Sequence, residues 1–361
     1  MERRVFEKYL RRSGEIPRLG AVFSRAAVIP ACDEADELPR TLDALEKALV
    51  RAPRPTAVIA VVNHPSGASE RPSLETLRLL EARKAPWLAT LYAPGISGGV
   101  GAARKLGMDS FLAAQTAESA DDTIIWSLDA DTRVEANYFF TVEAAFAAHP
   151  RAGFCTLGFR HEPGATPELE RAIREYEAYL RGYVENLRRA GSPYAFMSIG
   201  SAFAVRGAAY VRAGGMKVRQ AGEDFYFLQE CTKCGEFFEL AEVLVHPSAR
   251  RSGRNVFGTG PALEKILNGG GLNHIAPAAF DGLKTLLAAA RDPERLADPE
   301  RLLAAVPEKP RAFLQSARFA ENWRRILANT PDDPGSRERA FHRWFDGLKT
   351  LRFLHALAPE R

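Results

Sequence analysis

The residues best suited to chemistry are Asp129 and Asp131, which are separated by one alanine and follow the apolar run IIWSL at 124–128. Residues i and i+2 of a strand point the same way, so both carboxylates would share one side of its carboxyl end. Such a pair suits Mg²⁺ or Mn²⁺, and open α/β sheets bind ligands at this edge. The alternative is structural: Asp131 and Thr132 would cap a helix spanning 134–148.

Further carboxylates lie near predicted helix starts. Asp33 and Glu34 fall in the acidic loop between a strand and a helix, where helix amides point outward, and helix capping alone would explain them. Glu223 and Asp224 follow Gly222 at another helix start. A carboxylate there is either a cap or a general base that accepts a hydroxyl proton.

Two basic segments would suit an anionic ligand. A glycine-rich run at 95–101 leads into a helix that carries Arg104 and Lys105, and such a helix start favours a phosphate. It matches neither the Walker A loop nor the dinucleotide fingerprint. The second segment is a loop with one histidine and three arginines: His246, Arg250, Arg251 and Arg254. The arginines suit a diphosphate and the histidine a metal, although a solvated basic loop has the same composition.

The elements that position these residues alternate in type. Apolar runs predict strands at 26–31, 57–63, 87–93, 123–129 and 152–159, and leucines at helical spacing predict helices between them. This alternation predicts an α/β fold with a mostly parallel sheet. Further along, we expect one long helix across 166–190. Two strands should follow, at 198–206 and 237–246. From about residue 261 onward, we expect helices only. Asp292 and Asp298 each open a DPERL segment, which predicts two capped helix starts.

Composition narrows the function classes. The 361 residues are 46% hydrophobic and carry a net charge of +4, which excludes a disordered chain and gives no reason to expect a nucleic-acid partner. The four cysteines exclude a disulfide scaffold, and we expect Cys231 and Cys234 to be reduced thiols without a metal or redox role. The charged N-terminus and short apolar runs predict a cytoplasmic protein with no signal peptide and no transmembrane span.

Taken in order, five segments resemble family 2 glycosyltransferases of the GT-A fold. They are VIPACDEADELPRTLDAL, GGVGAARKLGMD, WSLDADTRV, GSAFAVR and GEDFYF. The resemblance implies a Rossmann-like, mostly parallel sheet flanked by helices. It divides the chain into an N-terminal extension, a nucleotide-sugar domain and a C-terminal helical appendage: 1–25, 26–260 and 261–361.

The resemblance also implies roles. The donor would be a nucleotide-diphosphate sugar, bound with Mn²⁺ or Mg²⁺. Its nucleoside and diphosphate would contact Pro30, Ala31, Asp33 or Glu34, Asn63, Arg104, Asp129, Arg250 and Arg254. The metal ligands would be Asp129, Asp131 and His246. The acceptor would contact Gly200, Ser201 and Glu223, and Asp224 would be the catalytic base of an inverting displacement.

Some features depart from the family pattern. Cys32 opens a motif that commonly reads Tyr-Asn-Glu, the second strand lacks the usual acidic pair, and the Gln-x-x-Arg-Trp motif of processive members is absent.

The alternatives to an inverting glycosyltransferase are a retaining GT-A enzyme, a sugar-phosphate nucleotidyltransferase and a non-catalytic nucleotide-sugar-binding protein. The acceptor, whether glycan, lipid or small molecule, is not specified.

Two further segments carry expectations. We expect the polar stretch 252–260 to close over the donor. Phe341, Trp344, Phe345 and Leu354 recur at helical spacing and predict one helix across 341–357. It would pack against the catalytic body or another subunit, or lie on a membrane surface and reach a lipid-linked acceptor.

Overall fold

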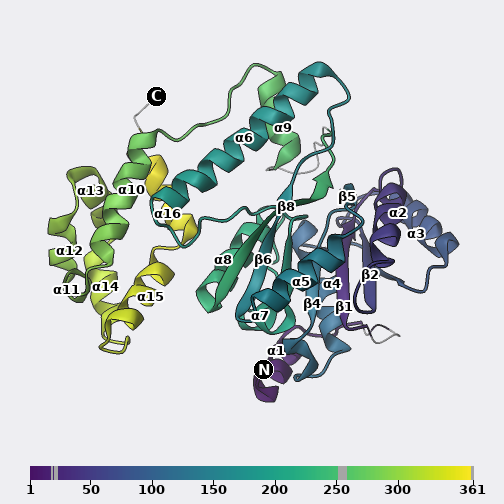
Figure 1. Cartoon of the computed structure of the whole chain (residues 1–361), viewed down its shortest axis with the longest axis horizontal. Helices are drawn as coiled ribbons and strands as arrows, with labels where there is room; N and C mark the ends of the chain where they lie inside the picture. Colours follow the sequence, from purple (N-terminus) through teal and green to yellow (C-terminus); the bar gives the residue numbers. More distant parts are fainter. Residues whose placement is uncertain (18, 20–22, 251–257, 359–361) are drawn as a thin grey trace. The chain divides into compact units, whose positions relative to one another are not determined.

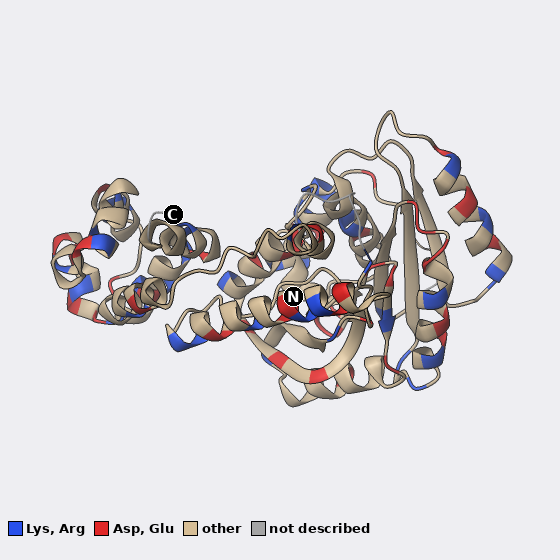
Figure 2. Cartoon of the chain, turned by 90° about the horizontal axis from the view of Figure 1, so that it is seen from above, with Lys and Arg blue, Asp and Glu red and all other residues tan. Residues whose placement is uncertain are grey.

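The computed structural model describes residues 1–17, 19, 23–250 and 258–358. Its contacts divide the chain into two compact units. The first contains Met1–Arg174 and Ser198–Gly270, and the second contains Glu175–Met197 and Gly271–Arg361. The long helix α6, Pro167–Arg189, contributes residues to both units. Basic and acidic residues are interspersed along the helices, in keeping with the small net charge (Figure 2).

The first unit is built on a sheet. Its described residues form eight strands in the order β3-β2-β1-β4-β7-β6-β8-β5 (Figure 1). Neighbouring β3, β2, β1 and β4 are parallel, as are β6 and β8, whereas β7 and β5 run antiparallel to their partners. The α/β prediction is confirmed, with a mixed sheet. The strands are Arg25–Ala31 (β1), Thr56–Asn63 (β2), Leu88–Ala93 (β3), Ile124–Ser127 (β4), Thr132–Val134 (β5), Ala152–Phe159 (β6), Phe203–Arg206 (β7) and Glu236–Pro247 (β8).

Helices flank this sheet. Because β1 and β2 are buried along their whole length, their sequences are nearly continuous apolar runs. Leu38, Leu42 and Leu45 recur at helical spacing and are fully buried along α2, as their pattern predicted. Besides α6, the helices of this unit are Arg3–Arg12 (α1), Leu38–Leu49 (α2), Arg71–Arg83 (α3), Gly99–Ala113 (α4), Tyr138–Ala148 (α5), Gly207–Arg212 (α7), Glu223–Cys234 (α8) and Thr259–Leu267 (α9).

Two expectations for this unit are wrong. The segment after Asp131 does not begin a helix, because Thr132–Val134 forms β5 and pairs with β8. The helix starts only at Tyr138, so the alternative in which Asp131 caps it is wrong. The strand expected across 198–206 is limited to Phe203–Arg206, since only those residues pair with a neighbouring strand.

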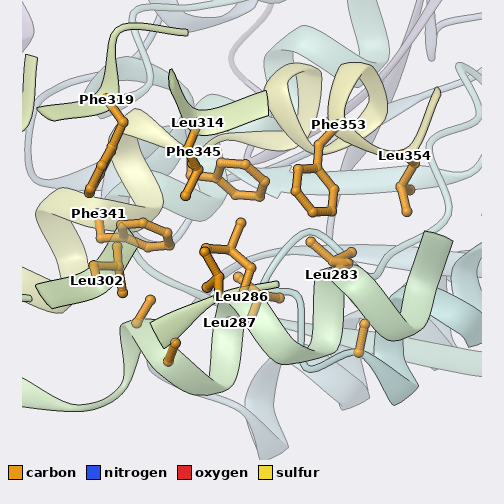
Figure 3. Packing of buried hydrophobic residues seen from close by; sticks show 14 of the residues in the cluster. Leu283, Leu286, Leu287, Leu302, Leu314, Phe319, Phe341, Phe345, Phe353 and Leu354 are labelled. Atoms are coloured by element: carbon orange, nitrogen blue, oxygen red, sulfur yellow. The ribbon is translucent and has the colours of Figure 1, made fainter. Parts of the chain in front are cut away.

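The second unit is helical. Its core is a cluster of leucines and aromatic rings, in which Leu283, Phe345 and Phe353 point toward one another (Figure 3). Asp292 and Asp298 each cap a helix through the side chain, as their DPERL segments predicted. Besides the end of α6, its helices are Pro277–Ala290 (α10), Pro293–Ala297 (α11), Pro299–Ala305 (α12), Glu308–Ser316 (α13), Phe319–Leu327 (α14), Pro334–Trp344 (α15) and Gly347–Leu357 (α16).

The single helix expected across 341–357 is also wrong. α15 ends at Trp344, and Asp346 caps the start of α16 by accepting a hydrogen bond from the Lys349 amide at 3.0 Å. Phe341, Phe345 and Leu354 are all buried in the core of the second unit. These side chains are therefore not part of an apolar face available to a membrane surface. Among the described residues, we find no helix of the length and apolarity that a bilayer crossing requires.

Candidate functional site

The candidate site lies at the carboxyl ends of β1, β2 and β4. These strands are parallel neighbours, so the residues that follow them meet at one edge of the sheet. Asn63 ends β2, and the Asp129–Asp131 loop follows β4. Two hydrogen bonds fix that loop: the hydroxyl of Thr41 donates to the Ala130 carbonyl at 2.7 Å, and the amide of Ser248 donates to the Asp131 carbonyl at 3.1 Å.

Arg104 on α4 is the central cation of the site. Only 2% of its side chain is exposed. Its Nε donates to Glu223 Oε1 at 3.0 Å, its Nη1 donates to Ser127 Oγ at 2.6 Å, and its Nη2 forms an ion pair with Asp129. Burial by itself lowers the pKa of Arg104, but the nearby carboxylates outweigh that effect and raise the pKa above its ordinary value. Arg104 is therefore a permanent internal counter-ion that joins Asp129 to the start of α8.

The glycine-rich run positions this arginine. The Gly101 amide donates to the Arg219 carbonyl at 3.1 Å, and a Cβ at Gly101 would lie 2.3 Å from the Lys217 carbonyl oxygen. Gly99 has φ +62°, and a Cβ there would lie 2.8 Å from Gln220 Cα. These glycines let α4 approach the segment that precedes α8. Close packing thus accounts for part of the pattern that had suggested a phosphate-binding loop.

Asp224 has the properties of a general base. Burial raises the pKa of its carboxyl group to about 7, and the charge of Glu223 adds to that effect. The hydrogen bond from the Phe225 amide, at 2.8 Å, and the charge of Arg104 oppose the increase. Asp224 keeps part of its surface exposed, unlike the buried Glu223 beside it. An accessible carboxylate that titrates near neutral pH can accept a proton from a bound hydroxyl group.

Gly200 lies against the Arg104–Asp129 pair. Its carbonyl accepts a hydrogen bond from Ser127 Oγ at 2.7 Å, and a Cβ at this position would lie 2.5 Å from Arg104 Nη2. The neighbouring Ser201 is fully buried, and its hydroxyl oxygen has no hydrogen-bond partner within the described part of the chain. A buried polar atom in that state is costly unless a ligand or water satisfies it.

Arg250 is the second cation of the site. Its Nε donates to Asp131 Oδ2 at 2.8 Å, and its Nη2 donates to the two Glu34 carboxylate oxygens at 2.6 and 2.7 Å. Burial lowers the pKa of Arg250, yet the two carboxylates raise it overall. Glu34, Asp131 and Arg250, which lie about 100 or more positions apart in the chain, thus form one charged cluster. It lies beside the Arg104–Asp129 ion pair.

The residues predicted to contact the donor nucleoside lie at the same edge of the sheet, at the carboxyl ends of β1 and β2. Pro30 and Ala31 are buried at the end of β1, whereas Asp33 is exposed and has a φ of +56°. Asn63 is buried, with 4% exposed, and its amide oxygen has no hydrogen-bond partner among the described residues. An acceptor in that state would suit the donor groups of a nucleobase.

His246 has other partners than the two aspartates. Its Nδ1 lies 3.1 Å from the Arg160 carbonyl oxygen, and its Nε2 lies 2.7 Å from Glu135 Oε1. No group of three or more His, Cys, Asp or Glu side chains able to hold a metal ion occurs in the described ranges. Asp129 and Asp131 still provide the hard oxygen donors that Mg²⁺ uses when substrate phosphates complete its coordination. The residues present therefore fit a cation bound together with a substrate.

Some predicted residues lie outside this geometry, and one important residue was missed. Arg254 and most of the loop expected to close over the donor lie outside the described residues. Ser127, which binds both Arg104 and the Gly200 carbonyl, was not predicted. The available signal was a polar residue inside an apolar strand two positions before Asp129.

Burial raises the pKa of Cys231, in keeping with the expected unreactive thiol.

No protein-family profile and no curated protein matches the chain. It is similar to the structure of S. aureus TarS 1–349 in complex with UDP-GlcNAc, at 12% identity and TM-score 0.47, covering 89% of this chain and 91% of that one. A mannosyltransferase from Pyrobaculum calidifontis in complex with GDP-Man and Mn²⁺ gives 16% identity and TM-score 0.44, covering 97% and 91%.

A third similar structure is mannosyl-3-phosphoglycerate synthase from Rubrobacter xylanophilus, at 15% identity and TM-score 0.40, covering 74% of this chain and 80% of that one. All three TM-scores lie below 0.5. These similarities therefore assign no activity to this chain.

Proposed function

We propose that this chain is a glycosyltransferase of the GT-A type that moves a sugar from a nucleotide-diphosphate donor to an acceptor hydroxyl group with inversion. The observation that carries the proposal is the Asp224 carboxyl group, whose pKa is about 7, beside the Arg104–Asp129 pair at the ligand-binding edge of an α/β sheet. The resemblance of five ordered segments to family 2 glycosyltransferases supports the same reaction.

The donor nucleoside would lie over the ends of β1 and β2. Asn63 offers a buried amide oxygen to the base, and Pro30 and Ala31 give that part of the pocket an apolar wall. Asp33 or Glu34 would lie beside the ribose. Asp129, which Arg104 holds in place, would face the sugar.

The carboxylates that follow β4 support a divalent cation. Asp129 and Asp131 lie at the carboxyl end of this strand, and hard oxygen donors of this kind bind Mg²⁺ or Mn²⁺. A cation there would also reduce the repulsion between these carboxylates and an incoming diphosphate. Mg²⁺ or Mn²⁺ bound at Asp131 would neutralise the diphosphate and make it a better leaving group.

Arg250 would be the protein's own contribution to that neutralisation. It now contacts Asp131 and Glu34, and its guanidinium group has the planar geometry that binds phosphate oxygens in a bidentate manner. Arg254 belongs to the same basic segment and is proposed to assist. When a donor enters, we propose that Arg250 moves from the carboxylates to the diphosphate.

The chemical step then depends on Asp224. The acceptor, held near Gly200, Ser201 and Glu223, gives its hydroxyl proton to the Asp224 carboxylate. The acceptor oxygen forms a bond to the anomeric carbon as the bond from that carbon to the diphosphate breaks, which releases the nucleoside diphosphate. Because this is one displacement from the opposite face, the anomeric configuration inverts.

Donor binding can be tested with the full chain and a panel of UDP, GDP, dTDP and CDP, each with Mn²⁺, Mg²⁺ or EDTA. A ligand that binds only the folded protein must raise the melting temperature. We expect one nucleotide to raise it in a metal-dependent manner, and we expect Asp131→Asn to abolish the increase.

The matched control is Asp36→Asn, because Asp36 is exposed in the same segment that carries Glu34. It should retain the full increase. If no nucleotide raised the melting temperature, or if both variants lost the effect equally, the proposed donor site would be wrong.

A further inference from the structure

A cavity of about 300 Å³ lies at the opposite edge of the sheet from the candidate active site. It is lined at the start of β1 by Arg25 and at the start of β4 by Ile124, whereas the active-site residues follow the carboxyl ends of those strands. The seven residues of β1 separate the two places by roughly 20 Å. The volume falls at the lower end of the range for small-molecule sites.

The walls of this cavity are largely apolar. Phe146 is buried, while Phe140 on the same helix, α5, is 55% exposed and Ala144 is also exposed. Phe140 is one of the few large apolar side chains of the described residues with this much exposed surface. An exposed ring beside a cavity provides a flat apolar surface for a ligand.

One residue of the lining has an unmet hydrogen-bonding capacity. Glu143 Oε1 is buried and has no hydrogen-bond partner within the described ranges, while Oε2 of the same carboxylate accepts from Arg25 Nε at 3.3 Å. Only 9% of the Glu143 side chain is exposed. Burial raises the pKa of Glu143 despite the opposing charge of Arg25. A buried oxygen in this state needs a donor from a ligand or water.

The arginines of the lining are largely occupied. Arg206 donates through Nε to the Ala152 carbonyl and through Nη2 to the Phe146 carbonyl, both at 3.0 Å. Arg25 donates to the Ser24 carbonyl at 2.8 Å as well as to Glu143. Arg54, which forms an ion pair with Asp122, is 47% exposed and is the most accessible guanidinium group of the three.

These groups restrict the ligand. A cation would meet three arginines, whose charge the two carboxylates of the lining, Glu143 and Asp122, offset only in part. An anion would meet those carboxylates, while each of the three arginines already has an acceptor. A neutral hydroxyl group avoids both conflicts, because it can donate to Glu143 and accept from Arg54. A ring with hydroxyl groups and an apolar C–H face would also cover Phe140.

We propose that this cavity is a second binding site, for a neutral, polyhydroxylated ring of the size of a single sugar residue. The ring lies against Phe140, and one of its hydroxyl groups donates to Glu143. The site is separate from the proposed donor and acceptor site and does not depend on it.

The test is ligand-observed saturation-transfer NMR on the full chain with glucose, galactose, mannose and N-acetylglucosamine, and with benzoate as an anionic probe. We expect at least one sugar to give a signal and Phe140→Ala to reduce that signal at least fivefold. Glu143→Gln should reduce it as well. Melting curves of both variants show whether they remain folded.

Two controls separate this site from the rest of the molecule. Val50→Ala removes an exposed apolar side chain of the same unit that does not line the cavity, and it should leave the signal unchanged. Asp224→Asn should also leave it unchanged, because that residue belongs to the other edge of the sheet. Failure of the proposed transfer reaction would therefore not affect this result.

The proposal is overturned if no sugar gives a signal at 50 mM (about the weakest binding such a site would show), or if the signal persists in folded Phe140→Ala. It is also overturned if the sugar signal disappears in Asp224→Asn but not in Phe140→Ala, which would assign the binding to the active site. A benzoate signal that alone depends on Phe140 would assign the cavity to anions instead.

Discussion

Replacing Asp224 with asparagine should abolish transfer and stabilise the folded protein at alkaline pH. The carboxyl pKa is about 7 in the folded chain and 3.8 in a model carboxyl group. The native state therefore opposes ionisation of this group, although the proposed reaction needs the ionised form. Asparagine has nearly the same shape and carries no charge, so it removes both the base and the buried charge.

The magnitude follows from the pKa difference. A raised pKa of an acid contributes stability that is fully present below about pH 3.8 and is lost as the pH rises through about 7. Three pKa units correspond to about 4 kcal/mol, and because Asp224 keeps some exposed surface, solvent screening makes about 2 kcal/mol a reasonable lower value. In a unit of this size, that corresponds to an increase in melting temperature of roughly 5–15 °C at pH 8.

The assay is a series of melting curves from pH 5 to pH 8 for the wild type, Asp224→Asn and Asp36→Asn. The advantage of Asp224→Asn should grow with pH and be less than half as large at pH 5. The exposed control should stay within about 0.5 kcal/mol of the wild type. Asp224→Asn could instead melt below the wild type at pH 8, or show the same pH dependence as the wild type. Either result would mean that folding does not raise the pKa of Asp224.

Three further predictions concern stability and packing. Arg104→Gln leaves the Glu223 and Asp129 carboxylates without their buried partner and should lower the free energy of unfolding by about 3–5 kcal/mol. The control Arg171→Gln, at an exposed position, should lower it by less than about 1 kcal/mol. Urea unfolding of both variants measures the difference. Gly200→Ala would place its Cβ 2.5 Å from Arg104 Nη2, so we expect lower activity and lower stability than wild type, measured by turnover and melting curves. Asp292→Ala removes the α11 cap and should lower the free energy of unfolding of the second unit by about 1 kcal/mol in denaturant titrations without affecting nucleotide binding.

The fold was largely predictable because its elements are marked locally. The runs that form β1 and β2 are buried on both faces, so their sequences are nearly continuous and apolar. The capping aspartates at 292 and 298 act through the next few amides, a signal that also lies within a few residues. The prediction of a single helix across 341–357 was wrong because the apolar spacing continues across Asp346, which caps a new helix.

The candidate site was predictable in part. The Asp129–Asp131 pair and Asp224 are recognisable from residue type and position after a strand or before a helix. Their partners are not, because the contacts of Arg104 with Glu223 and of Arg250 with Glu34 join residues more than 100 positions apart. The cavity beside Glu143 carries no sequence signal, since its lining comes from α5 and from short pieces of several strands and loops that each look like ordinary packing.

The central claim is that Asp224 accepts the proton in a sugar-transfer reaction. The most direct measurement is the release of nucleoside diphosphate from UDP-, GDP-, dTDP- and CDP-sugars by the full chain, with water as the acceptor, followed from pH 5 to pH 9. We predict release from sugars of one nucleotide only, rising with pH through about 7 in the wild type and absent from Asp224→Asn. Equal release by the wild type and Asp224→Asn, or no release from any donor, would contradict the proposed mechanism.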